Sequence, residues 1–310
     1  MLRVPFRRPR IAAKAPLRAL GAHPVWEQEN RASIANQTAN KPKKVDTMAV
    51  LQVTLESNCL LRKVTLQAIL PVDRIAYPGA PKPEEKPLPT LYLLHGMFGS
   101  HTDWIEGTRI VRFAMEKGLA VIMPAGENHF YVDCDHTGEA YGAFIGEELP
   151  ALCRRMFPLS PRREDTAVAG LSMGGYGAIR NGLKYAHTFG HAAGLSSAFV
   201  MDRFLSDGED ESGRLFTFRR PFYRAIMGDL EALPGSDKDV RALALSRKAE
   251  GNLPRLYLAC GTDDGLLEPN RAYARFLKEN DIPVTYEEGP GGHDWTFWDT
   301  YIRRVLDWLP

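Results

Sequence analysis

The chain has 310 residues, of which 44% are hydrophobic and 25% charged. This length and composition are typical of one large folded domain with a sizeable core, and they exclude a mostly disordered chain. The net charge of +1 excludes a general basic field, and the sequence has no run of 18 apolar residues that could span a bilayer. We therefore expect neither nucleic acid nor a membrane as a partner.

The charge is uneven along the chain. Residues 1–47 hold ten Lys and Arg against three Asp and Glu, about +7, which leaves about −6 for the rest. This segment lacks the continuous apolar stretch of a secretory signal, so we interpret it as a disordered basic extension, with a targeting presequence as the alternative. The four cysteines are widely spaced and form no CxxC pair, as expected for incidental thiols in a reducing, cytoplasmic setting.

From Met48 onward, strand-like and helix-like segments alternate. Strands are predicted at 49–57 and 62–73, as an antiparallel edge pair, and then at 90–96, 119–124, 165–172, 191–197, 254–262 and 283–289. Helices are predicted at 104–118, at 141–157 with a kink or break at Pro150, and at 173–186, 269–280 and 293–309. Apolar strands that alternate with helices indicate one α/β domain over 48–310, with a mostly parallel sheet and helices on both faces.

Two stretches interrupt this alternation. The proline-rich segment 78–89 is predicted to be a surface loop. Residues 199–237 hold an acidic stretch followed by an aromatic and basic one. An insertion of this length over the carboxyl ends of the strands predicts a short lid, and a solvated excursion is the alternative.

One serine lies in an unusual turn. In "TAVAGLSMGGYGAIR" (166–180), Ser172 stands between Gly170 and Gly174, after a predicted buried strand and before a predicted helix. A Gly-x-Ser-x-Gly match is weak alone in a chain with 27 glycines, but this strand–turn–helix context is the one that presents a nucleophilic hydroxyl. The start of the helix also directs free N–H groups at the same place. A tightly packed crossing without chemistry is the alternative.

A serine hydroxyl needs a base to become nucleophilic, and the base needs an orienting acid. On this kind of sheet both follow the serine, with the acid first. His187 and His191 lie too close to the next strand to reach over the sheet. His293 lies in a loop with two glycines between the last strand and the last helix, so we assign it as the base.

The acid is sought after the preceding strand, in "LYLACGTDDGLLEPN". Asp264 is preferred, because a Gly-x-x-Asp spacing from Gly261 clears the end of the strand. Asp263 stays open as an alternative, and Glu268 is a distant third.

Acyl transfer to a serine also passes through an oxyanion that two backbone donors must stabilise. One donor follows the nucleophile, the N–H of Met173, and the other is expected from the loop "HGMFG" (95–99), at Met97. His95 and Trp104 are expected to brace this loop. Aromatic residues of the insertion favour its acting as a wall of an acyl pocket: Phe216, Phe218, Phe222 and Tyr223.

The blocks "LLHGMFGSHTDW", "GEELPALCRRMFPLS", "AGLSMGGYGA", "CGTDDGLLEPN" and "GGHDWTFW" together resemble the putative esterase (esterase D-like) family of α/β-hydrolases. Within it, the chain is most similar to tributyrin-type short-chain carboxylesterases over about 50–310. The resemblance implies a serine carboxylesterase with a Ser172–His293–Asp264 triad, oxyanion donors at Met97 and Met173, a small-molecule ester as substrate and no cofactor.

The resemblance leaves other functions open. S-formylglutathione hydrolases, feruloyl or cinnamoyl esterases and mycolyltransferases are relatives, and proteins of this type commonly self-associate, so a homo-oligomer is one expected partner state. A protein of another class, a non-catalytic binding module on the same fold, should lack a member of the triad, and this chain lacks none.

Three further clusters are given structural interpretations. "YVDCDH" (131–136) is interpreted as a polar loop near the cleft, since no HExxH or CxxC accompanies it as a metal site would require. Glu147 and Glu148 are expected to face solvent on a helix. Trp295 and Trp298 are expected to pack in the core under the last helix.

Overall fold

The structure is a computed structural model that describes residues 48–73, 86–201 and 219–310. The basic segment 1–47, residues 78–85 of the proline-rich loop and residues 202–218 of the insertion lie outside the described residues, so the structure does not bear on the interpretations given to them. Residues 46–310 group into one compact unit.

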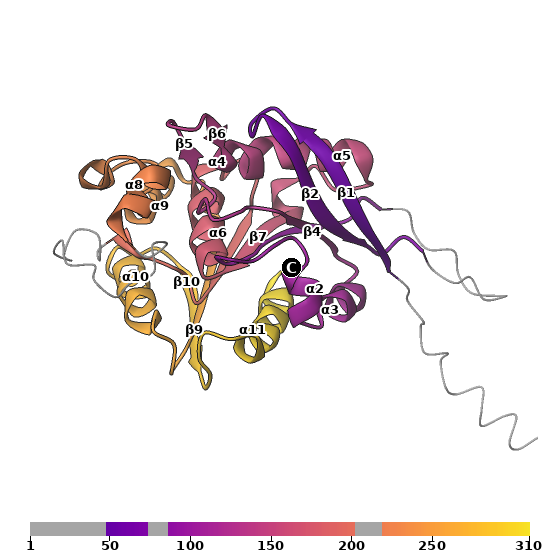
Figure 1. The fold of residues 1–310 in the computed structure, drawn as a ribbon. Helices are drawn as coiled ribbons and strands as arrows, with labels where there is room; N and C mark the ends of the chain where they lie inside the picture. The colour runs from indigo at the N-terminus through magenta and orange to yellow at the C-terminus, as the bar shows by residue number, and fades with distance from the viewer. Residues whose placement is uncertain (1–47, 74–85, 202–218) are drawn as a thin grey trace, which may run out of the picture. The chain divides into compact units, whose positions relative to one another are not determined.

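The described strands of this unit form an eight-stranded sheet in the order β1-β2-β4-β3-β7-β8-β9-β10 (Figure 1). The predicted antiparallel edge pair is confirmed, β2 and β4 are also antiparallel, and the remaining pairs are parallel. The strands are β1 (Ala49–Ser57), β2 (Arg62–Leu70), β3 (Thr90–Leu94), β4 (Ala120–Pro124), β7 (Thr166–Leu171), β8 (His191–Leu195), β9 (Arg255–Gly261) and β10 (Val284–Gly289), and β5 (Asp133–Cys134) pairs separately with β6 (Glu139–Ala140).

This strand order predicts where a ligand binds. From β3 the chain moves to β4 on one side and then to β7, β8, β9 and β10 on the other. In an open α/β sheet, the crevice for a ligand lies at the carboxyl ends of the strands where the order reverses in this way. Here that point lies between the loops that follow β3 and β7.

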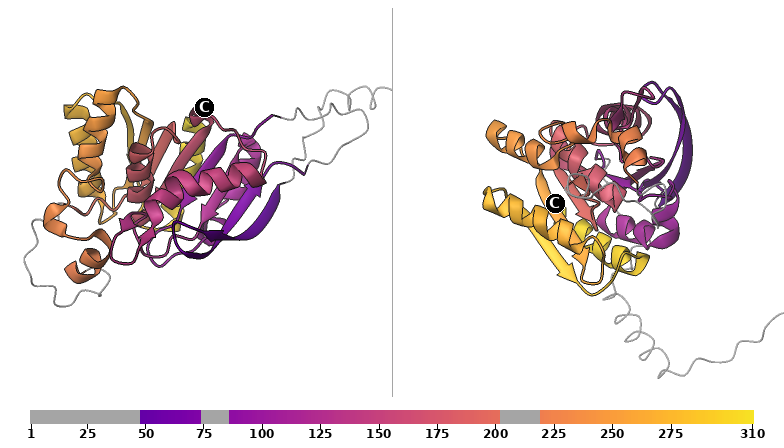
Figure 2. Two further views of the ribbon diagram at one scale, coloured as in Figure 1. Left: turned by 90° about the horizontal axis from the view of Figure 1, so that it is seen from above. Right: turned by 60° about the vertical axis from the view of Figure 1, so that its left-hand side comes forward.

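Helices cover both faces of the sheet (Figure 2), so the predicted α/β architecture is confirmed. Within the described ranges, no helix is long and apolar enough to cross a lipid bilayer. One face carries α2 (Asp103–Gly107), α3 (Ile110–Lys117) and α11 (Trp295–Trp308), and the other packs with α4 (Tyr141–Ala143), the π-helical turn η1 (Phe144–Glu148), α5 (Leu149–Met156), α6 (Met173–Lys184), α8 (Arg220–Met227), α9 (Val240–Glu250) and α10 (Leu267–Glu279).

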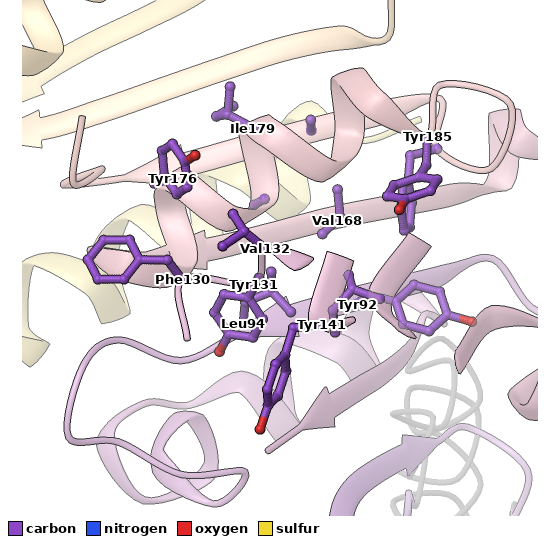
Figure 3. Packing of buried hydrophobic residues seen from close by; sticks show 14 of the residues in the cluster. Tyr92, Leu94, Phe130, Tyr131, Val132, Tyr141, Val168, Tyr176, Ile179 and Tyr185 are labelled. Carbon is purple, nitrogen blue, oxygen red and sulfur yellow. The ribbon is translucent and has the colours of Figure 1, made fainter. Parts of the chain in front are cut away.

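The strands supply both hydrophobic cores, because successive side chains of a strand point to opposite faces. In β3, Leu91 and Leu93 belong to the core under α11, whereas Tyr92 and Leu94 belong to the core under α6. Figure 3 shows part of the second of these, to which α6 contributes Tyr176 and Ile179 and β7 contributes Val168. Leu183, one turn after Ile179 on α6, is buried with them.

The prediction of one continuous helix over 104–118 is wrong. The chain forms α2 and α3 instead, separated at Thr108, whose backbone is extended (φ −143°, ψ 173°). Gly107 lies flat against Trp295, and a Cβ at this position would overlap the indole ring. The break therefore lets the end of α2 pack directly on the first turn of α11.

The segment predicted at 141–157 is helical over 141–156, and its irregular turn lies directly before Pro150. The turn Phe144–Glu148, directly before Pro150, is π-helical. Pro150 has no N–H to donate to Gly146 O, and this carbonyl accepts a hydrogen bond from Thr188 Oγ1 (2.8 Å) instead. The expectation that Glu148 faces solvent is wrong. Its carboxylate accepts hydrogen bonds from Ser57 Oγ (2.5 Å) and from the N–H groups of Asn58 (2.8 Å) and Cys59 (3.1 Å), and so holds the β1–β2 turn. Glu147 is exposed, as predicted.

Candidate active site

Ser172 ends β7 and immediately precedes α6, as predicted. Its backbone is left-handed (φ 54°, ψ −118°), a conformation that costs a residue with a Cβ on the order of 1–3 kcal/mol and persists only where the surroundings enforce it. Two hydrogen bonds do so, from the Ser172 N–H to Leu195 O and from the Ala198 N–H to Ser172 O, both 2.9 Å long. The loop after β8 therefore holds the turn from one side.

The two flanking glycines let α6 approach the ends of β3 and β7. A Cβ at Gly174 would lie 2.5 Å from both His95 O and Leu94 O, and a Cβ at Gly170 would overlap Gly174 O. The Gly-x-Ser-x-Gly pattern is thus required by close packing of strand and helix, and this packing leaves the serine hydroxyl over the edge of the sheet.

The structure brings Ser172, His293 and Asp264 together from the ends of three strands. His293 Nε2 lies 3.0 Å from Ser172 Oγ, and His293 Nδ1 lies 2.9 Å from Asp264 Oδ2. A carboxylate can only accept, so Nδ1–H donates to Asp264, and Nε2 of the neutral ring accepts from the serine hydroxyl. This is the tautomer that a general base for Ser172 requires.

The environment of Asp264 favours its charged form. The side chain is fully buried, and Oδ1 accepts the Leu266 N–H at 2.8 Å. Burial alone would raise the pKa of Asp264, but the hydrogen bonds from His293 and from the Leu266 N–H outweigh it, and the pKa lies below its ordinary value of 3.8. The carboxylate is therefore ionised at neutral pH.

The other candidates lie elsewhere. Asp263 and Glu268 are exposed, and Glu268 pairs with Arg271. His191 begins β8, opposite the start of β7 rather than its end, and His187 is exposed near Glu147. These placements agree with the reasons for which the sequence disfavoured them.

The loop that holds His293 lies close to the end of β9, where Gly261 leaves room for it. A Cβ at Gly261 would overlap Gly291 O, and the Asp263 N–H donates to the same oxygen at 3.0 Å. The missing side chain of Gly261 therefore allows the loops after β9 and β10 to touch. This contact sets the height of His293 over the sheet.

Trp298 supports the imidazole from the side of α11. Its ring meets His293 edge-on at 5.0 Å between centroids, and its Nε1–H donates to Ser196 Oγ at 3.2 Å. Trp298 is buried, as predicted, but together with Trp295 it also lines the cleft at Ser172, which the prediction of simple core packing missed. No pattern in the sequence links Ser196 to a residue about a hundred positions later.

The loop after β3 is fixed by His95. The ring donates through Nδ1 to Gly96 O (2.7 Å) and accepts the Gly126 N–H at Nε2 (2.9 Å), while Trp104 Nε1–H donates to Leu94 O (3.0 Å). Gly96 O and the Met97 N–H belong to one planar trans peptide group and point in opposite directions. The hydrogen bond from His95 to Gly96 O therefore also sets the direction of the Met97 N–H. Bracing of this loop by His95 and Trp104 was predicted, and these contacts supply it.

A cleft of about 510 Å³ opens over Ser172. Its walls come from both faces of the sheet, since Phe130 and Tyr223 belong to one core and Trp298 to the other. Tyr223 lies in α8, within the predicted insertion, whereas Phe216 and Phe218 lie outside the described residues. The remaining lining is mainly apolar and includes Met97, Phe98, Leu171, Val200, Leu266 and Trp295.

The cysteines and the segment "YVDCDH" (131–136) are the other groups in the chain that could be reactive or bind a metal. Cys59, Cys134, Cys153 and Cys260 are all unpaired thiols. Cys260 is buried, and burial raises the pKa of its thiol to about 12, so it is not a nucleophile at neutral pH. In "YVDCDH", Asp133 binds Lys184 and the Ala143 N–H, and among the described residues no group of three or more His, Cys, Asp or Glu is arranged to hold a metal ion.

The chain is similar to known esterases over most of its length. A family model described as "Putative esterase" matches residues 57–309. The acetyl esterase of Caldicellulosiruptor saccharolyticus is 43% identical over 263 residues, which cover 84% of this chain and 98% of that protein.

Two solved structures from Staphylococcus aureus extend the similarity to the fold. The S-formylglutathione hydrolase FrmB superposes with a TM-score of 0.71 at 32% identity and covers 85% of this chain and 99% of its own. FphF, a fluorophosphonate-binding serine hydrolase, gives 0.72 at 31% identity and covers 84% and 98%. Both have the sheet and helix arrangement described above.

Proposed function

Because the chain belongs to the putative esterase family, with an α/β-hydrolase fold and the activity of a serine-type carboxylic ester hydrolase, we propose that it cleaves short-chain acyl esters through an acyl-enzyme on Ser172. The observation that carries this proposal is the continuous hydrogen-bonded chain from Ser172 Oγ through His293 to Asp264.

In the first half-reaction, Ser172 Oγ attacks the ester carbonyl carbon while His293 Nε2 takes the hydroxyl proton. Asp264 stays ionised and stabilises the imidazolium that forms. The C–O bond to the alcohol then breaks, and the imidazolium returns its proton to the departing alkoxide oxygen.

In the second half-reaction, a water molecule gives its proton to His293 Nε2 and attacks the acyl carbon. Collapse of this intermediate expels Ser172 Oγ, which recovers the proton, and the free acid leaves. In both halves the carbonyl oxygen becomes an oxyanion, which we assign to the N–H groups of Met97 and Met173. One such donor lowers the barrier by about 3–4 kcal/mol.

We base the preference for short acyl chains on the aromatic lining of the cleft. Phe130 is fully buried and meets Tyr223 at 5.5 Å between ring centroids, so packed aromatic rings form part of the wall of the cleft. We expect p-nitrophenyl acetate and butyrate to be hydrolysed, with kcat/KM falling beyond about eight acyl carbons. Folded protein that is inactive on all short esters would refute the proposal.

A second candidate is the hydrolysis of S-formylglutathione, which the similarity to FrmB over 85% of the chain favours. A panel of acetyl, butyryl and feruloyl esters with S-formylglutathione separates the candidates by kcat/KM. The same chemistry applies to each, since a thioester also passes through a tetrahedral oxyanion.

The nucleophile can be tested without knowing the natural substrate. A fluorophosphonate probe is attacked at phosphorus by an activated serine with loss of fluoride, so one equivalent should bind to Ser172 and none to Ser172→Ala. Labelling of Ser172→Ala at the wild-type rate would place the nucleophile elsewhere.

A further inference from the structure

The loop after β3 contains a bulky side chain where glycine would be expected. Residues Gly96–Gly99 form a turn closed by the Gly99 N–H and Gly96 O at 3.3 Å, and its third residue, Phe98, has φ +64°. A positive φ at the third position of a turn is the feature that normally selects glycine or asparagine. For a residue with a Cβ this conformation is strained, and a phenylalanine here is a clear outlier.

Phe98 is exposed, unlike two other aromatic residues that have a positive φ. Phe130 and Tyr131 also have positive φ (51° and 56°), but both side chains are fully buried, so their packing offsets the backbone strain. Phe98 is 64% exposed. Its position thus combines a strained backbone with an aromatic ring that remains largely in water.

The strained residue Phe98 lies in the cleft over Ser172. The residue follows Met97, our assigned oxyanion donor, and lines the cleft together with Ser172 and His293. The Phe98 N–H donates to Asn128 Oδ1 at 2.8 Å, so the loop after β4 holds the strained backbone in place. The turn that carries Phe98 is therefore fixed, and it holds this residue in the lining of the cleft.

We infer that Phe98 is a substrate-contact residue, whose ring covers an apolar aliphatic or aromatic group of the ester while the carbonyl lies at Ser172. A residue that is 64% exposed in the free enzyme is then covered in the complex, and burial of its apolar surface contributes to substrate binding. The inference rests on the proposed function and extends it, because it implies a substrate with an apolar group larger than ethyl on its acyl or alcohol side.

The test compares three substrates, namely ethyl acetate, ethyl hexanoate (apolar acyl group) and 2-naphthyl acetate (apolar alcohol). In Phe98→Gly and Phe98→Ala, kcat/KM on one or both of the larger esters, taken relative to kcat/KM on ethyl acetate, should fall about ten- to a hundredfold, as expected for a lost aromatic contact. Phe98→Tyr, which keeps the ring, should retain wild-type selectivity. The larger ester that responds identifies the side of the substrate that Phe98 covers.

Leu61 provides a matched control. It also has a positive φ (52°), is 77% exposed and lies in the β1–β2 turn, away from the cleft. Leu61→Gly and Phe98→Gly should both unfold at or above the wild-type temperature, since glycine relieves the strain. Leu61→Gly should keep wild-type kcat/KM on all three esters.

The outcomes separate this inference from the proposed function. Wild-type protein that hydrolyses none of the three esters overturns both. Active wild type with an equal loss on all three esters in Phe98→Gly and Phe98→Ala overturns the substrate contact in favour of a role in shaping the oxyanion loop. Unchanged kinetics, or a clear fall in the unfolding temperature of Phe98→Gly, overturns it as well.

Discussion

At the scale of single residues, several residues with a strained backbone lie in the loops at one edge of the sheet, the edge that holds Ser172. Ser172, Phe98, Phe130, Tyr131 and Ser196 all have positive φ, and all belong to the loops that follow β3, β4, β7 and β8. Such conformations are retained where the surrounding structure enforces them, and they gather at functional sites.

Ser172→Ala should abolish ester hydrolysis with little effect on stability. Alanine keeps the Cβ in the same backbone conformation and removes only one partly exposed hydrogen bond. We expect kcat to fall at least about 10³-fold and the unfolding temperature to change by less than about 3 °C. Assays with p-nitrophenyl butyrate and thermal melts check this, and substantial turnover by the variant contradicts the mechanism.

Asp264→Asn and Asp263→Asn form a matched pair that identifies the acid. The Asp264→Asn variant lacks the charge that stabilises the imidazolium, and we expect its kcat to fall about 10³–10⁴-fold. Asp263 is exposed, so its variant should stay within about twofold of wild type. Similar activities for the two variants would exclude Asp264 from the orienting role.

At the scale of elements, a buried charge ties the predicted insertion to α6. Arg180 is fully buried in α6, donates through Nε to Asp237 O (2.9 Å) and pairs with the Asp237 carboxylate, to which Lys184 also donates. This cluster fixes the segment that returns from α8, whose Tyr223 lines the cleft. The contact between elements distant in sequence thus shapes the pocket.

Asp237→Ala should lower the free energy of unfolding by about 2 kcal/mol, because it leaves the buried Arg180 without its counter-charge. We expect less than the 3–5 kcal/mol typical of a buried pair, since the Asp237 side chain is 42% exposed and water screens it. Chemical denaturation measures the difference. An unchanged midpoint would show that the pair contributes nothing to stability.

The same carboxylate predicts a pH dependence. Burial alone would raise the pKa of Asp237, but Arg180 and Lys184 outweigh it, and the pKa lies below its ordinary value of 3.8. The ionised group therefore stabilises the fold above pH 3.8, and this contribution is lost as the pH falls through the lower folded value. The stability difference between wild type and Asp237→Asn should shrink over this acid range, and a constant difference would contradict the assignment.

At the scale of the whole molecule, the site and both hydrophobic cores lie within 48–310, and the family model matches 57–309. Residues 46–310 also group into one compact unit. We therefore propose that the basic extension is dispensable for folding and hydrolysis.

Protein comprising residues 48–310 should keep kcat/KM on p-nitrophenyl butyrate within about twofold of the full chain, with an unfolding temperature within about 3 °C. Parallel assays and melts of the two proteins test this. A large loss in the shorter protein would assign residues 1–47 a role in the fold or the site.

The sequence by itself determined the chain order of the strands in the eight-stranded sheet, the serine turn and the order of the three candidate triad residues. These features depend on local patterns, such as apolar runs, glycines beside Ser172 and polar residues after strands. It did not predict α8 and α9, although Asp239, which caps α9 by accepting the Arg241 and Ala242 N–H groups, was an available signal.

Only the tertiary structure decided the features that depend on contacts between distant segments. The break at Thr108 follows from Trp295 packing on Gly107, and Glu148 is turned inward by the β1–β2 turn. Likewise, the burial of Asp264 against His293 favours it over its exposed neighbour Asp263. In each case the stabilising contact is made with a residue far away in the chain. A local sequence pattern contains no information about which distant residue will lie next to it in the fold.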